Sequence, residues 1–185
     1  ILLPFALSFV VTGTVWAYMY RPTGGVLNSF LGLLGVDVSA AMKNGSLMWA
    51  SSNRTIMLSI IIAMVWQFSG YVAVIFLAAI KNVPVNVINA AKLDGAYMPR
   101  IYWKLKGAMG SCITILAMYA LRSFDFIVSL VGYTTSSAWT LPIWMYNEAF
   151  QSNNFAYSAA ISCFLLALVL VLILPLTYWT NRRKA

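Results

Sequence analysis

The stretch IMLSIIIAMVWQFSGYVAVIFLAAI, residues 56–80, decides the fold class of this chain. It contains no charged residue, and it is longer than the roughly 20 residues that an α-helix needs to cross the hydrocarbon core of a bilayer. Its aliphatic and aromatic side chains favour insertion into a membrane by roughly 4 to 8 kcal/mol. We therefore predict that residues 56–80 form a transmembrane helix.

Three further stretches resemble the first in length and composition: about 1–19, 108–131 and 155–179. The chain is 62% hydrophobic and 9% charged, whereas about a quarter of the residues of a soluble domain are charged. A soluble fold of this length has too little interior to bury so much apolar surface. The sequence thus predicts an all-α membrane protein, a polytopic helical bundle in which residues 1–185 form a single transmembrane domain.

Polar segments at 20–55, 81–107 and 132–154 connect these spans, and a polar tail follows residue 179. With four crossings, the segment 81–107 and the tail share one side of the membrane. This side holds most of the basic residues, namely Lys81, Lys92, Arg100, Lys104, Lys106, Arg182, Arg183 and Lys184. Because cytoplasmic loops are enriched in Lys and Arg, we expect 81–107 and the C-terminus in the cytoplasm, and loops 20–55 and 132–154 outside.

Several classes of function are disfavoured by the composition. The chain has no histidine, and Cys112 and Cys163 both lie within apolar runs, so no metal site is predicted. Few pairs for acid–base catalysis can be built from the acidic residues, so no catalytic residue is predicted. The net charge of +8 is spread between apolar runs instead of forming a continuous basic stripe, which disfavours nucleic acid as a partner.

The segment between the second and third spans predicts two short helices joined by a bend. Pro84 and Pro99 suit the first turns of helices, and Gly95 suits the left-handed conformation that ends one. Such an elbow can dock onto a soluble partner protein. The residues alone equally allow an amphipathic loop that lies on the lipid headgroups.

The same segment contains a recognisable motif. Asn89-Ala90-Ala91-Lys92-Leu93-Asp94-Gly95-Ala96, followed by Tyr102 and Leu105, resembles the EAA motif of the maltose-type permeases of binding-protein-dependent ABC importers. Other family landmarks occur in the family's order along most of the chain: Trp16, Gly24-Gly25, Asn28, Trp66, Gly70-Tyr71, Phe124-Asp125, Tyr146 and Ala149-Phe150. The resemblance implies a type I importer core of six helices, of which this chain holds the last four. Its apolar start without Met fits missing N-terminal spans.

The resemblance further implies how the chain works. Coupling to an ATPase is expected at Asn89, Ala90, Ala91, Asp94, Gly95 and Ala96. The expected partners are a second permease subunit, two ATPase subunits that bind ATP and Mg²⁺, an extracytoplasmic solute-binding protein and membrane lipid, with no cofactor in this chain. The expected location is the cytoplasmic membrane of a prokaryote, and the expected solutes are sugars. Asn89 replaces the family's glutamate and Gly107-Ala108 its Leu-Pro, which predicts weaker or asymmetric coupling.

Two charged residues, Arg122 and Asp125, fall inside the predicted span 108–131. At mid-membrane they would cost about 5 to 7 kcal/mol, more than the roughly 3 to 5 kcal/mol that the apolar residues of this span supply. They must therefore lie near the membrane boundary or face protein or a water-filled path. One interpretation is that they line a solute cavity together with Gln67, Tyr71 and Tyr119. The other is an ion pair that holds two helices together.

Two classes of transporter compete for these features. The leading interpretation is a permease subunit of an ATP-driven importer with no catalytic site of its own. The alternative is an ion-coupled secondary carrier that uses Arg122 and Asp125 as its coupling pair.

Outside the membrane, residues 140–150 predict a short amphipathic helix whose apolar side carries Leu141, Trp144, Met145 and Phe150.

Overall fold

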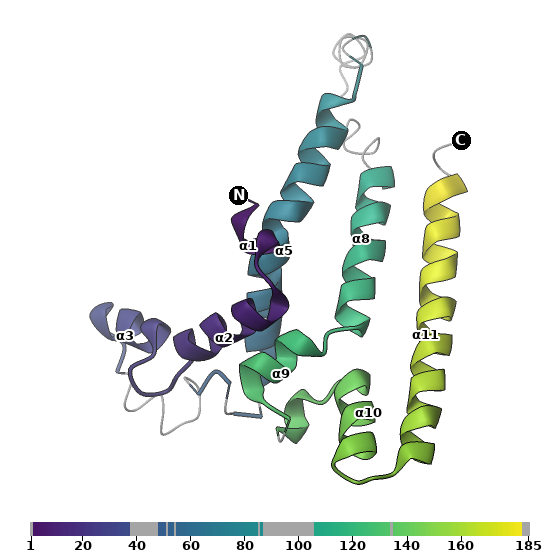
Figure 1. The fold of residues 1–185 in the computed structure, drawn as a ribbon. Coiled ribbons are helices and arrows are strands. Elements are labelled where there is room, and N and C mark those ends of the chain that lie inside the picture. The colour runs from purple at the N-terminus through teal and green to yellow at the C-terminus, as the bar shows by residue number, and fades with distance from the viewer. Residues whose placement is uncertain are drawn as a thin grey trace.

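The computed structural model describes residues 2–37, 48–50, 52–53, 55–84, 86, 106–133 and 135–182. In this part of the chain every regular element is helical, which confirms the predicted all-α class. Three long helices run side by side: α5 (Ile56–Lys81), α8 (Lys106–Leu121) and α11 (Phe155–Arg182) (Figure 1). Most of the shorter helices gather around one end of these three, whereas α1 (Leu3–Ala6) lies beside the middle of α5.

Two of the predicted spans are unbroken helices. α5 begins at the residue that the sequence predicts, and α11 begins at Phe155 as expected and continues to Arg182. Both are long and apolar enough to cross a membrane. α11 contains Pro175, which it tolerates one to two turns before its C-terminal end.

The predicted span 108–131 is divided. α8 ends at Leu121, α9 covers Asp125–Val131, and the two helices are bent by 55° at the break between them. The carbonyl of Ser123, which the break frees from helical bonding, accepts a hydrogen bond from the hydroxyl of Thr140 at 3.3 Å. α8 and α9 together are long and apolar enough to cross, but not as the straight helix that the sequence suggests.

The predicted span over residues 1–19 is also divided, and its prediction as one continuous helix is wrong. α1 (Leu3–Ala6) ends before Leu7, and α2 (Phe9–Met19) has only 11 residues, which is too short to cross a bilayer alone. Ser8 is the reason for the new start, because its hydroxyl caps α2 by accepting the amide of Val11 at 3.2 Å. The freed carbonyl of Leu7 accepts a hydrogen bond from the side-chain amide of Gln67 at 3.2 Å.

α2 and α9, the two helices that follow these breaks, cross in close contact (Figure 1). Gly13 lies at the crossing: a Cβ atom there would sit 2.7 Å from the carbonyl oxygen of Phe126 and 2.7 Å from the Cβ of Ser129. No side chain fits at position 13 without moving a helix. The core around this crossing includes Trp16, Tyr20, Ile56, Ile60, Phe126, Ile127, Leu130 and Ile143.

Residues separated in sequence meet at the landmark positions noted above. The rings of Trp16 and Trp66 lie edge to face with centroids 5.7 Å apart, and those of Phe124 and Tyr146 are 5.3 Å apart. Asn28, in α3 (Val26–Leu33), accepts the indole N–H of Trp49 at 2.8 Å. The landmarks therefore act at least partly as packing contacts.

α10 (Leu141–Phe150) is the short helix that residues 140–150 predict, but its apolar side is not the predicted one. Its buried residues are Pro142, Ile143, Asn147 and Ala149, of which Ile143 belongs to the core cluster that includes Trp16 and Ile127. Trp144 and Phe150 are exposed instead. A short 3₁₀ helix, η2 (Ser136–Ala138), precedes it.

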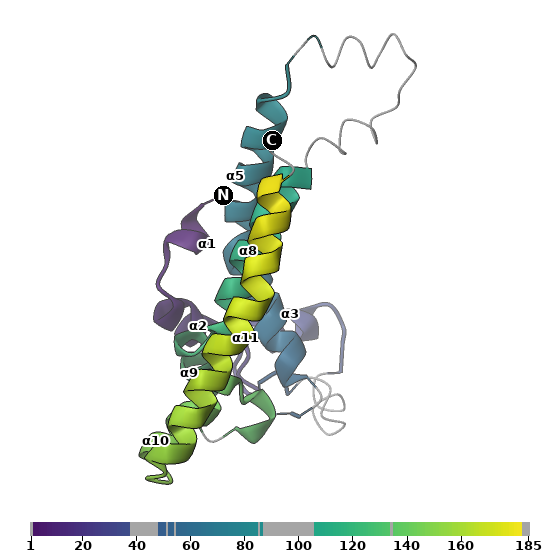
Figure 2. The same ribbon diagram turned by 90° about the vertical axis from the view of Figure 1, so that its right-hand side faces the viewer.

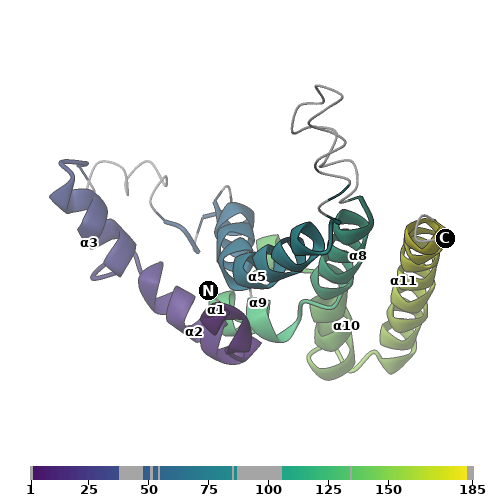
Figure 3. The same ribbon diagram turned by 90° about the horizontal axis from the view of Figure 1, so that it is seen from above.

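The long helices also define two ends of the molecule. The C-terminal end of α5, the start of α8 and the C-terminal end of α11 lie at one end, and α10 lies at the other (Figures 1 and 2). Segment 81–107 therefore begins and finishes at the end where α11 finishes. Viewed from above, α3 projects to one side, away from α8 and α11 (Figure 3).

Candidate functional site

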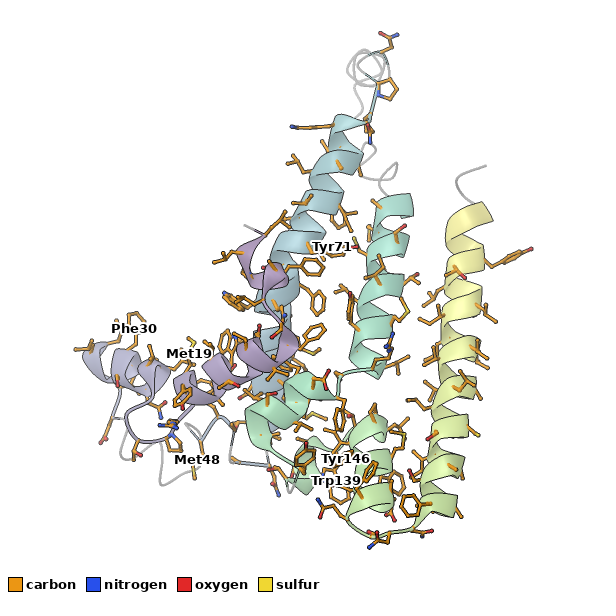
Figure 4. The ribbon with its side chains drawn as sticks, in the orientation of Figure 1. Met19, Phe30, Met48, Tyr71, Trp139 and Tyr146 are labelled. Carbon is orange, nitrogen blue, oxygen red and sulfur yellow. The ribbon has the colours of Figure 1, made fainter. Side chains whose placement is uncertain are left out.

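A cavity of about 390 Å³ lies where the break between α8 and α9 faces α5 and α2. The break contributes Arg122, Ser123, Phe124 and Asp125 to its wall. Other walls come from Phe9 at the start of α2, Met64 and Tyr71 on α5, and Ile115, Met118 and Tyr119 on α8. In Figure 4, the side chain of Tyr71 lies on the side of α5 that faces α8. The volume falls within the range of small-molecule sites.

A second cavity, of about 300 Å³, adjoins the first and shares Phe9, Tyr119 and Asp125 with it. It lies at the other break, because Leu7 and Ser8 line it together with Gln67 of α5. The two broken helices thus meet at two neighbouring cavities. In membrane proteins, irregular backbone at membrane depth is tolerated where it is buried in protein or lines a water-filled path.

All five residues that the sequence nominates for a solute cavity line these two spaces. Tyr71 and Arg122 line the first, Gln67 lines the second, and Tyr119 and Asp125 line both. Arg122 and Asp125 come together for a reason other than the helical spacing that the sequence suggests. The helix stops between them, and both remain beside the cavity at the bend.

Aromatic rings form much of the cavity wall. Phe5 stacks on Tyr71 with ring centroids 4.5 Å apart, and Tyr119 contacts Phe68 at 4.9 Å and Phe9 at 5.7 Å. Phe5 and Phe9 were not predicted as site residues, because a continuous helix over 1–19 gives no reason to turn them inward. Ser8, a good N-cap residue in an apolar run, was the available signal for the break.

The charged pair does not form an ion pair in the described part of the chain. Arg122 and Asp125 are both exposed, and their charged groups lie beyond ion-pair distance of each other. The interpretation that they pin two helices together as an ion pair is therefore unsupported within this chain.

Burial against its neighbours, the adjacent Tyr146 and the carboxylate of Asp125 together raise the pKa of Tyr133, just beyond α9.

Gln67, on α5, holds the break before α2. Its side chain is 2% exposed, and its amide nitrogen donates to the carbonyl of Leu7 at the break before α2. Its amide oxygen is buried and accepts no hydrogen bond from the described residues. The structure thus places Gln67 as a support of the break, with its amide oxygen enclosed by protein.

The predicted coupling residues Asn89, Ala90, Ala91, Asp94, Gly95 and Ala96 lie outside the described residues. The structure describes only the ends of this segment, to Asn86 on one side and from Lys106 on the other.

Apolar helices, with two predicted spans broken where polar and aromatic side chains line cavities, are typical of helical membrane transport proteins. Comparison of sequences then gives the family. Residues 33–184 match the model of the family described as "Binding-protein-dependent transport system inner membrane component", and the chain belongs to this family. This membership supports the prediction of an importer permease and does not support the alternative of an ion-coupled secondary carrier.

Curated relatives agree with this family. The chain is 43% identical to a probable ABC transporter permease protein of Pyrococcus horikoshii, over 97% of the chain and 62% of the relative. It is 35% identical to the xylose/arabinose import permease protein XacH of Haloferax volcanii, over 98% and 57%. With the diacetylchitobiose uptake system permease protein NgcF of Streptomyces coelicolor it shares 30% identity over 97% and 51%. The chain therefore spans roughly half to three fifths of the length of these relatives.

A solved structure shares the fold. The chain superposes with a TM-score of 0.79 on a chain of a bacterial ABC transporter involved in the import of the acidic polysaccharide alginate. The match covers 97% of this chain and 63% of that one, at 21% sequence identity. At this identity the likeness supports the arrangement of the helices and nothing about the solute.

Proposed function

We propose that this chain belongs to a sugar-importing permease subunit, which forms the solute path and is driven by ATP hydrolysis in partner ATPases. The observation that carries the proposal is the meeting of two broken helices at adjoining cavities lined by Gln67, Tyr71, Tyr119, Arg122 and Asp125. Breaks in helices provide both polar groups for a solute and positions where a path can open.

The wall chemistry favours sugars. A sugar ring presents C–H groups that pack on aromatic faces and hydroxyl groups that exchange hydrogen bonds with polar side chains. Phe5, Phe9, Tyr71 and Tyr119 supply the rings, and Gln67 and the charged pair supply the polar groups. The names of two relatives, for xylose/arabinose and for diacetylchitobiose, agree with this choice.

The proposed coupling lies in segment 81–107. In this proposal the segment faces the cytoplasm of a prokaryotic cell, with the C-terminus on the same side, and Asn89 to Ala96 contact an ATPase that binds ATP and Mg²⁺. The remaining partners are a second permease subunit, a second ATPase subunit and an extracytoplasmic solute-binding protein. The support is the concentration of basic residues in 81–107 and the tail, and the shared end of α5, α8 and α11.

The test of import uses the full-length subunit with its partners in proteoliposomes. Labelled xylose, arabinose and diacetylchitobiose are offered with the solute-binding protein outside and ATP inside. We expect ATP-dependent uptake of at least one sugar and none when the ATPase carries an inactivating substitution. Uptake driven by an ion gradient without ATP would contradict the proposal.

The test of coupling uses the segment itself. A cysteine in place of Gly95 is expected to crosslink to a cysteine in the ATPase groove of the assembled complex. Asp94→Ala should uncouple ATP hydrolysis from uptake while the complex still assembles. Labelling of Lys92 by an impermeant reagent from outside intact cells would overturn the proposed orientation.

A further inference from the structure

We infer that a row of four aromatic side chains, Phe124, Tyr146, Phe150 and Phe155, is a binding surface on which the rings of a sugar stack as it enters the larger cavity from outside. We call this row the aromatic track. The inference rests on the proposed solute path, and it adds a binding surface outside the two cavities together with the chemical class that the surface accepts.

The first observation is that the aromatic track is continuous and begins at the cavity. Phe124 lines the larger cavity, and the centroid of its ring lies 5.3 Å from that of Tyr146. The centroids of Tyr146 and Phe150 are 4.9 Å apart, and those of Phe150 and Phe155 are 6.5 Å apart. Every step lies within the roughly 4.5 to 7 Å at which aromatic rings are in contact. The break after α8, helix α10 and the start of α11 thus contribute to one row of rings.

The second observation is the change of exposure along the track. Phe124 and Tyr146 are half-buried, whereas Phe150 and Phe155 are 63% and 62% exposed. The row therefore leads from the wall of the cavity to open surface. It ends at the end of the molecule that holds α10, which is the outer end in the proposed orientation (Figure 1).

The third observation is the polar surface between the two exposed rings. The sequence Gln-Ser-Asn-Asn, residues 151–154, separates Phe150 from Phe155, and all four residues are exposed. A surface that faces lipid is apolar throughout, as residues 164–174 of α11 are. Aromatic faces beside amide and hydroxyl groups instead match a sugar, whose C–H groups pack on rings and whose hydroxyl groups exchange hydrogen bonds. The occupant that we infer is therefore a sugar and not an acyl chain.

Tyr133 adds a polar edge to the inner half of the track. Its ring stacks on that of Tyr146 with centroids 4.9 Å and planes 18° apart. Burial raises the pKa of Tyr133, and the nearby Tyr146 and Asp125 raise it further. The track thus reaches the cavity beside a phenol hydroxyl and a carboxylate, both of which can bond to a sugar hydroxyl.

The test detects bound sugar by NMR, so it does not require transport. The assembled full-length transporter is reconstituted in nanodiscs without ATP and mixed with xylose, arabinose or diacetylchitobiose. Its aromatic protons are then saturated, and the transfer of saturation to the C–H protons of the sugar is measured. We expect transfer to at least one sugar. The transfer should be about threefold smaller in the double variant Phe150→Leu/Phe155→Leu, which keeps apolar side chains and removes two rings.

Trp144→Leu is the matched control for the NMR measurement. Trp144 is also an exposed aromatic residue of α10, but its ring pairs with that of Tyr157 at 5.8 Å, and neither residue lines the larger cavity. We expect this variant to retain the transfer of the parent. Absence of transfer in the parent, equal transfer in the parent and the double variant, or an equal loss in Trp144→Leu would each overturn the inference.

Uptake gives a second readout at one ring of the track. Phe150→Leu should lower the initial rate of ATP-dependent sugar uptake about threefold, and Phe150→Tyr, which restores a ring, should return it to the rate of the parent. A parental rate in Phe150→Leu would contradict a role of the track in entry. If the parent binds sugar on the track and imports none, the proposed function fails and the track stands, so the two failures are distinguishable.

Discussion

The α8–α9 pair and α11 are both long and apolar enough to cross a membrane, yet only the first is broken. The first carries Arg122 and Asp125 in its middle, whereas α11 has no charged residue before Arg182. Just 6% of the apolar window of α11 is buried within the chain, so most of its surface is left for lipid or other protein. In this pair the charged span is broken beside a cavity and the uncharged α11 is continuous. The uncharged run 1–19, which divides into α1 and α2 where Ser8 caps a new helix, shows that a break does not require charge.

The largest expected effect concerns the close crossing at Gly13. Gly13→Leu must push α2 away from α9, because a Cβ atom there already meets backbone at 2.7 Å. We expect a loss of about 3 kcal/mol in stability and failure to assemble, seen as a lower melting temperature in detergent. Ala167→Leu, at an exposed position of α11, is the matched control and should change stability by less than about 0.5 kcal/mol. Equal losses of stability in Gly13→Leu and Ala167→Leu would mean that the α2–α9 crossing is packed no more tightly than the outer surface of α11.

The next effect concerns transport. Asp125→Asn should reduce sugar uptake about tenfold, since a hydrogen bond to a charged group is worth roughly 1.5 to 3 kcal/mol. Protein stability should change little because Asp125 is exposed and its carboxylate forms no ion pair within the described residues. On α11, Thr177→Val also removes a hydrogen-bonding group and should leave uptake unchanged. Normal uptake by Asp125→Asn would mean that the charge at the α8–α9 break takes no part in the solute path.

A smaller effect is expected at Tyr20, which follows α2 and ties it to α5. Its hydroxyl donates to the carbonyl of Ser59 at 2.8 Å, and the side chain is 1% exposed. Tyr20→Phe should lower the free energy of unfolding by about 1 kcal/mol, measured by thermal melting near neutral pH. A loss of stability as large as that of Gly13→Leu would mean that the Tyr20–Ser59 hydrogen bond, and not the α2–α9 crossing, contributes most to the stability of this region.

The same tyrosine gives a pH dependence. Burial raises the pKa of Tyr20 to about 12. Because the unfolded chain releases this proton near pH 10 and the folded chain retains it, stability should fall as pH rises from about 10 to about 12. The slope should be shallower in Tyr20→Phe. An identical slope in both proteins would show that another group titrates.

The smallest effect is expected within α11. Pro175→Ala restores a backbone donor in the last turns of the helix and should change stability by less than about 1 kcal/mol, with unaltered uptake. The measurement is again melting and uptake in the same preparation. A large loss of uptake would mean that α11 needs its proline to move, and the contrast with the broken helices would fail.

Hydropathy and length predict α5 and α11 closely, whereas the uncharged run 1–19, predicted on the same grounds, divides into α1 and α2. The five residues that the sequence nominates, Gln67, Tyr71, Tyr119, Arg122 and Asp125, line the two cavities, and their role in a solute path stays a prediction. The face of α10 is predicted wrongly, because Ile143 packs into the core with Trp16 and Ile127 and Asn147 donates to the carbonyl of Tyr133, whereas Trp144 is exposed.

The breaks themselves are harder to predict. Their stability depends on side chains far away in the sequence: Gln67 accommodates the carbonyl of Leu7, and Thr140 accommodates that of Ser123. A local pattern cannot show which distant group will satisfy a freed backbone atom. Ser8 was a local sign of the first break, and it carries that meaning only once the apolar run is not assumed to be one helix.

The tight crossing of α2 and α9 has a mechanical consequence. With no gap at Gly13, these two segments can only translate or rotate as one piece. Bending of the backbone at residues 122–124 must therefore be accompanied by bending at residues 7 and 8. The two cavities beside these breaks would then widen or narrow together.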